Sequence, residues 1–136
     1  MIKEIVKDVF FLQQKSIDAT KDDIQIMKDM IDTLQANQDK CVGMAANMIG
    51  SLKKIVVFYD GKLVCLMVNP VIIKKKGLYT CEEGCLSLKG TRQAERYHEI
   101  TVQYLDMNFS KHTKKYTGYT AEIIQHEIDH FNGILI

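Results

Sequence analysis

The chain has 136 residues, about the length of one domain, so we expect a single domain over residues 1–136. Hydrophobic residues make up 46% and charged residues 26%, with a single proline, which excludes a disordered or collagen-like chain. Eighteen Lys and Arg residues against seventeen Asp and Glu residues give a formal net charge of +1, so the overall charge attracts neither nucleic acid nor an anionic membrane.

The N-terminal segment and the cysteines indicate the compartment. The first eight residues, MIKEIVKD, interrupt every apolar pair with charge, unlike the continuous apolar stretch of a secretory signal. No apolar run approaches the roughly 18 residues of a membrane span. We therefore predict a soluble, cytoplasmic protein. In a reducing compartment free thiols or metal ligands are favoured over disulfides for the four cysteines, Cys41, Cys65, Cys81 and Cys85.

Residues 20–39 have the pattern of an amphipathic helix near the N-terminus. Apolar residues recur at helical spacing, and two acidic residues stand in the first turn, where the helix dipole favours anions. The apolar residues are Ile24, Met27, Ile31 and Leu34, and the acidic ones are Asp22 and Asp23.

A β-hairpin is predicted next. The segments at 54–59 (KIVVFY) and 62–68 (KLVCLMV) are rich in β-branched and large apolar residues, and the Asp60-Gly61 pair between them is typical of a two-residue turn. The Asn69-Pro70 pair then predicts a break. Further strands are expected at 71–76, 99–106 and 114–119.

Residues 119–132 predict a second helix, with Thr120 as the candidate N-cap and Gly133 just past its end. Its apolar residues at core spacing are Ala121, Ile124, Ile128 and Phe131. The order helix, strands, helix predicts an α+β fold. We expect mixed or antiparallel sheets packed around the C-terminal helix, with the amphipathic helix near the N-terminus.

The segment HEIDH, from His126 to His130, lies inside this last helix. Two histidines four residues apart differ by about 40° around the helix axis, so both imidazoles can bind one metal ion. Glu127 is rotated by roughly 60–100° from them and can act as a general base beside the metal. A bare pair of histidines at this spacing is more often a solvated surface, but the glutamate between them favours a metal site.

A third ligand must come from elsewhere in the chain. Cys85 is the best candidate, because a thiolate binds zinc or iron(II) well. Gly84 lets the backbone pass close to a ligand, and the two glutamates before it are unusual neighbours for a core cysteine. Cys81 offers an alternative, in which both cysteines and both histidines close a structural zinc site.

Three ordered motifs resemble those of the peptide deformylases: a Gly-rich segment with paired alanines, then EGCLS, then HExDH. The second is intact at 83–87 and the third at 126–130, whereas the first reads CVGMAANM at 41–48. The family usually has glycine at the position of Cys41 and glutamine at that of Met48. The resemblance extends from about residue 22 to the end of the chain.

This resemblance implies a single deformylase-like catalytic domain, which removes the N-formyl group from the N-terminal methionine of new polypeptides and releases formate. Cys85, His126 and His130 would bind one divalent metal ion, and Glu127 would transfer the proton. The family favours Fe²⁺, whereas the donors alone also allow Zn²⁺, Ni²⁺ or Co²⁺. The implied partners are N-formylmethionyl peptides and nascent chains, with transient ribosome contact but no nucleic-acid specificity and no membrane.

The resemblance also assigns residues to the peptide. The backbone at Val42, Gly43 and Leu86 would bind the peptide, the N–H of Leu86 would face the oxyanion, and Arg92 would lie nearby. The sequence itself predicts an apolar pocket for the methionine side chain, lined by Val42 and by Ile123, which lies one turn before the first histidine.

Met48 cannot donate the hydrogen bond that the family's glutamine gives to the oxyanion. Asn47 is a candidate substitute, although the paired alanines fix the register and would direct its amide elsewhere. Two other interpretations therefore stay open. One is a deformylase-like protein that binds peptides with weak or no turnover, and the other is the structural zinc module, which has no need of Glu127.

Overall fold

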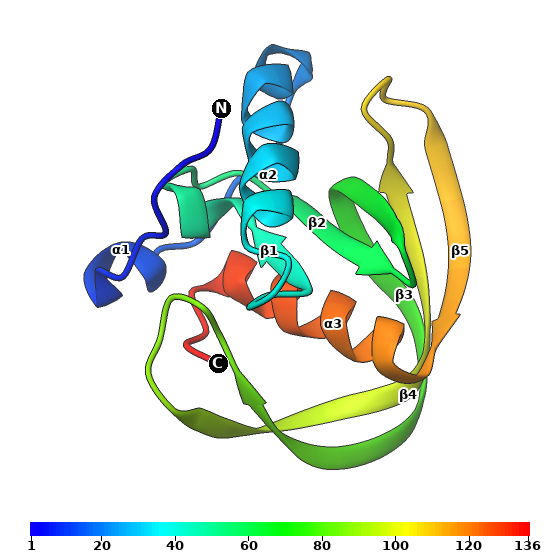
Figure 1. Ribbon diagram of the computed structural model, residues 1–136. Coiled ribbons are helices and arrows are strands. Elements are labelled where there is room, and N and C mark those ends of the chain that lie inside the picture. The colour runs from blue at the N-terminus through cyan, green and yellow to red at the C-terminus, as the bar shows by residue number, and fades with distance from the viewer.

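The computed structural model describes residues 1–136 (Figure 1). The strands are β1 (Gly43–Ala45), β2 (Ile55–Asp60), β3 (Leu63–Gly84), β4 (Thr91–Leu105) and β5 (Lys111–Thr117), and they form one antiparallel sheet in that order. The helices are α1 (Val9–Leu12), α2 (Ile24–Ala36) and α3 (Gly118–Asp129), with short 3-10 turns η1 (Lys21–Asp23), η2 (Ala46–Ile49) and η3 (His130–Asn132). This architecture confirms the α+β class, with a single antiparallel sheet.

The predicted N-terminal amphipathic helix is present as η1 followed by α2. The Thr20 side chain accepts a hydrogen bond from the backbone of Asp22, and the Asp23 carboxylate accepts one from the Thr20 backbone. The buried face is rotated from the predicted one, since Ile24 is 41% exposed whereas Met30 is fully buried. The helix ends at Ala36, so residues 37–39 lie beyond it.

The hairpin between β2 and β3 is confirmed, with Gly61 at φ +63° in its turn. The predicted break at Asn69-Pro70 is wrong, because β3 runs through it. Asn69 adopts φ +51°, and the register with β4 shifts between Val68 and Val71. The turn-forming pair is therefore absorbed as a bulge within a long, bent strand.

Residues 77–84 and 91–98, which were not predicted as strands, pair as the far arm of the β3–β4 hairpin. Many of their side chains are polar or charged, so no apolar alternation marks them in the sequence. The arm curves beneath α3 and returns its tip, residues 85–90, towards the C-terminal end of the helix (Figure 1). This curvature places Cys85 beside α3.

The C-terminal elements differ in detail from the prediction. β5 spans 111–117 rather than 114–119, and α3 begins at Gly118 with Thr117 as its N-cap residue. Thr120 is therefore not the cap; its hydroxyl donates to Asp60 at 3.3 Å. Gly133 follows η3 at φ +71°, as predicted for the residue past the helix end.

Strand β2 is buried on both of its faces. Val56 and Phe58 belong to the core cluster that contains the α3 residue Ile124. Ile55 and Val57 belong to the cluster that contains the α2 methionines. Because α3 also contacts β1, β2, β4 and β5, its position against the sheet is fixed. None of the helices is long and apolar enough to cross a membrane.

Candidate metal centre

Cys85, His126 and His130 come together from the β3–β4 tip and from the end of α3, with their ligand atoms all within 4.8 Å of one another. The Cys85 Sγ and the His130 Nε2 are 3.6 Å apart. A metal about 2.3 Å from sulfur and about 2.0–2.1 Å from nitrogen, at a tetrahedral angle, separates those two atoms by about 3.6 Å. The three side chains therefore fit one divalent metal ion.

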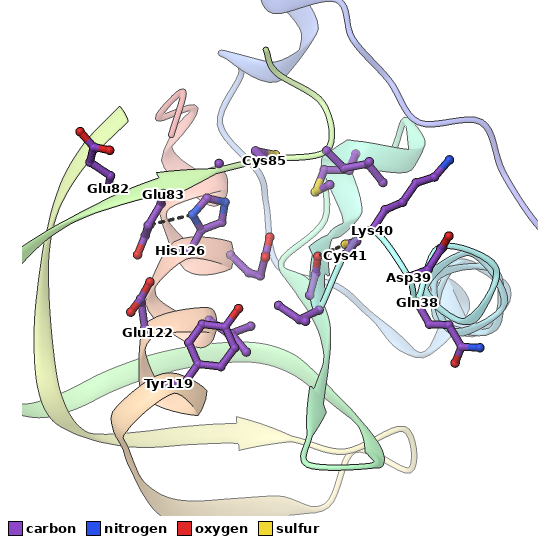
Figure 2. Close-up of a pocket in the computed structure, with 17 residues that line it drawn as sticks. Gln38, Asp39, Lys40, Cys41, Glu82, Glu83, Cys85, Tyr119, Glu122 and His126 are labelled. Atoms are coloured by element: carbon purple, nitrogen blue, oxygen red, sulfur yellow. Dashed lines mark hydrogen bonds and ion pairs between the residues drawn. The ribbon is translucent and has the colours of Figure 1, made fainter. Parts of the chain in front are cut away.

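His126 is oriented by a buried ion-pair network, of which Figure 2 shows the interaction with Glu83. Its Nδ1 lies 2.8 Å from Glu83 Oε1, which leaves Nε2 for a ligand. Arg96, only 4% exposed, donates to both Glu83 oxygens and, at 2.8 Å, to Asp129. Burial alone would raise the pKa of Glu83, but the hydrogen bonds with His126 and Arg96 lower it to about 2. Glu83 is thus a carboxylate that holds the imidazole in place.

Neither this role of Glu83 nor Arg96 was identified from the sequence. The two motifs carry acidic residues, Glu83 and Asp129, and a buried carboxylate requires a basic or hydrogen-bonding partner. The sequence does not say which one, because Lys89, Arg92 and Arg96 all follow the second motif. Choosing Arg96 required the β3–β4 register, which only the fold provides.

Glu127 is 5% exposed, and its Oε1 has no hydrogen-bond partner and lies 3.7 Å from His130 Nε2. Burial raises the pKa of Glu127 to about 7, so both its protonated and its ionised form are accessible near neutral pH. A Cβ at Gly43 would lie 3.0 Å from Glu127 Oε2 and 2.7 Å from Ile123 Cγ2. Glycine at this position therefore lets β1 approach the face of α3 that carries Ile123 and Glu127.

A cavity of about 470 Å³ opens beside these groups (Figure 2). Of the residues predicted to contact substrate or metal, those lining it are Val42, Gly43, Met48, Cys85, Leu86, Ile123, His126 and Glu127. Arg92 is not among them, and its guanidinium donates to the Lys89 carbonyl at 3.0 Å. Cys41 also lines the cavity; burial raises the pKa of its thiol to about 12, and the thiol donates to the Gly43 carbonyl at 2.7 Å.

The divergent first motif places Met48 at the cavity wall, 1% exposed. Asn47 does not line the cavity, and its Nδ2 lies 3.5 Å from the His130 carbonyl, which accepts its hydrogen bond. The amide of Asn47 thus faces η3, as the register of the paired alanines predicts.

Cys81 lies outside the three-ligand group. Its sulfur clusters instead with carboxylate oxygens of Glu83 and Glu122. The four soft ligands of the structural zinc hypothesis are therefore not brought together.

A cysteine and two histidines beside a buried glutamate, at the wall of an open cavity, define a metal-dependent hydrolase. The family model described as Polypeptide deformylase matches residues 2–136. The chain is 57% identical over 136 residues to a peptide deformylase of Clostridium beijerinckii, covering 100% of both proteins. It is 41% identical over 112 residues to peptide deformylase 2 of Clostridium acetobutylicum, covering 82% of this chain and 74% of that protein.

Comparison with solved structures indicates the same family as the sequence comparisons. A peptide deformylase from Thermotoga maritima superposes with a TM-score of 0.89 at 29% identity, covering 99% of this chain and 95% of that chain. A Met-Ala-Ser-bound class I type b peptide deformylase from Acinetobacter baumannii gives 0.87 at 26% identity, covering 99% and 97%. The chain belongs to the polypeptide deformylase family, and its activity is the hydrolytic removal of the formyl group from N-formylmethionyl polypeptides.

Proposed function

We propose that this deformylase acts in the cytoplasm on the formylmethionyl ends of nascent chains, in transient contact with the ribosome, with one Fe²⁺ held by Cys85, His126 and His130. The observation that carries the ligand assignment is the convergence of these side chains beside the unpartnered carboxyl of Glu127. The same donors would also accept Zn²⁺, Ni²⁺ or Co²⁺. The tripeptide named for the Acinetobacter structure, Met-Ala-Ser, supports a peptide with N-terminal methionine as the molecule in the cavity.

Each residue of the site then has a defined task in the proposed reaction. When bound, the metal ion supplies Lewis-acid activation of water and of the formyl oxygen. Glu127 takes the proton of the attacking water and passes it to the departing amine, a role suited to its pKa of about 7. The backbone N–H of Leu86 stabilises the negative charge that develops on the formyl oxygen.

The peptide itself would lie along β1. This strand is at the end of the sheet order, so one of its edges pairs with no other strand, and the backbone at Val42 and Gly43 can bind an extended peptide there. Val42 and Ile123, both at the cavity wall, would contact the methionine side chain. Arg92 would contact the peptide only after its guanidinium breaks its hydrogen bond to the Lys89 carbonyl.

The test of this assignment is metal analysis of anaerobically purified protein, combined with an assay on formyl-Met-Ala-Ser. We expect one iron per chain and formate release that follows metal content. Fully metallated protein that releases no formate would contradict the catalytic assignment and favour a peptide-binding role.

Glu83→Gln should weaken metal binding by roughly 10- to 100-fold, because the carboxylate that orients His126 loses its charge. Competition with a chelator measures this affinity. The matched control is Glu95→Gln, which removes an exposed carboxylate from the neighbouring strand β4. Equal metal affinity in the parent and both variants would show that Glu83 does not support the site.

Met48→Gln should raise kcat on formyl-Met-Ala-Ser by about tenfold or more, since it places an amide donor at the cavity wall in a side chain of nearly the same volume. The gain should appear in kcat rather than KM, because the new bond forms mainly in the transition state.

Asn47→Ala in the parent provides the comparison. If Met48→Gln is folded and metallated but no faster, a large loss of rate in Asn47→Ala would identify Asn47 as the existing donor. No change in either variant would contradict the proposed need for an oxyanion donor at this wall.

A further inference from the structure

A second cavity lies on the sheet, away from the metal ligands. It has a volume of about 530 Å³ and is lined by residues of β3, β4 and β5, which are neighbours in the sheet (Figure 1). Its charged side chains are Lys74, Lys75, Lys76, Lys115 and a single carboxylate, Glu99. We call it the basic groove. No residue lines both this groove and the cavity beside the metal ligands, so both can be occupied at once.

The strand register places three of these lysines on one face of the sheet. Lys74 pairs with Thr101, and Thr101 pairs with Lys115, so these side chains project from the same side. Lys76 is two residues beyond Lys74 in the same strand and projects likewise. Ile100 projects from the opposite side, where it is 1% exposed in the core. The lysine face is therefore the solvent face, and all three lysines are exposed.

This part of the sheet has an excess of positive charge. Residues 71–76 and 99–117 contain six of the eighteen Lys and Arg residues of the chain but only two of its seventeen acidic residues, Glu99 and Asp106. Glu99 lies 3.9 Å from the Lys115 ammonium and so neutralises at most one of the lysines. The rest of the chain has twelve basic residues against fifteen acidic residues. Such asymmetry within a chain of nearly zero net charge is typical of a surface for a polyanion.

The spacing of the lysines favours a chain of phosphates over a single anion. Lys74 and Lys76 are about 6.6–6.8 Å apart along β3, and two strand spacings, about 9.6 Å, separate Lys74 from Lys115. Their ammonium groups repel one another and therefore spread over the groove rather than converge on one phosphate. The only apolar residue in the lining is Ile100, which is buried, so the groove offers no apolar side chain for insertion into a lipid bilayer.

We propose that Lys74, Lys76 and Lys115 bind the phosphate backbone of RNA in this groove, without preference for base sequence. Contacts to phosphates position a protein on a nucleic acid but carry no sequence information. The choice of RNA rests on the proposed function, because nascent chains emerge from the ribosome, whose surface is largely RNA. The groove gives the proposed ribosome contact a defined surface that leaves the substrate cavity open.

The experiment measures the affinity of the metallated protein for a fluorescently labelled single-stranded RNA of about 16 nucleotides, by anisotropy. Three phosphate contacts predict a slope of about −2 for log affinity against log salt, so affinity should fall about 20-fold between about 50 mM and about 200 mM salt. The triple variant Lys74→Gln/Lys76→Gln/Lys115→Gln should lower the affinity at low salt by about tenfold or more and remove most of the salt dependence.

The matched control, Lys15→Gln/Lys21→Gln/Lys28→Gln, removes the same charge from exposed lysines outside the groove. Its affinity for RNA should stay within about twofold of the parent's, because charges beyond a Debye length of the groove are screened. None of the substituted lysines lines the cavity beside the metal ligands. Both triple variants should therefore hydrolyse formyl-Met-Ala-Ser at the parent's rate, which also shows that they are folded.

Equal loss of RNA affinity in the two triple variants would overturn the inference, because binding would then follow total charge alone. Undetectable binding of RNA by the parent at low salt would also overturn it, as would binding of phosphatidylserine-containing vesicles in place of RNA. A parent that binds RNA through the groove but releases no formate would support the groove and count against the proposed function. The two failures are therefore distinguishable.

Discussion

Cys85→Ser, His126→Ala and His130→Ala should each lose most of the bound metal, and with it the hydrolysis of formyl-Met-Ala-Ser by a factor on the order of 10³ or more. The reason is geometric. The three ligand atoms lie within 4.8 Å of one another, and no other cysteine or histidine joins their group to replace a lost donor. Metal content per folded chain and formate release measure the two effects.

Cys81→Ser is the matched control, because this cysteine also lies near the site but clusters with Glu83 and Glu122. It should keep the parent's metal content and activity. Metal loss in Cys81→Ser would restore the four-ligand zinc hypothesis. Full metal content in Cys85→Ser would remove the thiolate from the ligand set. Circular dichroism and thermal unfolding of each variant distinguish metal loss from failure to fold.

Glu127→Gln should retain one metal ion per chain and lose activity by a factor of about 10²–10⁴. The amide has nearly the shape of the carboxyl group, so it fits beside Gly43, where no Cβ could be accommodated. It cannot accept and release a proton at neutral pH. The loss should therefore appear in kcat, with little change in KM.

Glu127→Asp separates proton transfer from positioning. It keeps an ionisable group but withdraws it by about one methylene from the reacting atoms, so we expect activity between those of the parent and Glu127→Gln. Metal content and product affinity should stay at the parent's level in both variants. Nearly full turnover by Glu127→Gln would assign the proton transfer to another group.

Much of the candidate site could be predicted from the sequence because its signals are local. His126 and Glu127 lie in α3, and His130 begins the turn η3 that continues the helix, so helical geometry alone relates their side chains. The hairpin turn at Asp60-Gly61 and the amphipathic pattern of α2 likewise depend on neighbouring residues. Cys85 was accessible through its motif, since glycine and glutamate beside a cysteine are unusual in a core.

Other features depend on residues distant in the chain. The Glu83–His126 bond joins residues 43 positions apart, and Arg96 reaches Asp129 across 33 positions. The continuity of β3 through Asn69-Pro70 likewise contradicts local turn propensity, because pairing with β2 and β4 outweighs it.

The sequence by itself determined the helices α2 and α3, the β2–β3 hairpin, the ligand types and the spacing of the two histidines, since each depends on residues close together in the chain; the short helix α1 was not predicted. Only the tertiary structure decided that the β3–β4 arm curls beneath α3 and brings Cys85 to the histidines. It alone also decided that Arg92 stays outside the cavity and that Gly43 lies against Glu127. These outcomes depend on strand curvature and on packing across the sheet. Both bring together residues that lie far apart in the sequence, so the distance between them in the fold cannot be inferred from local sequence patterns.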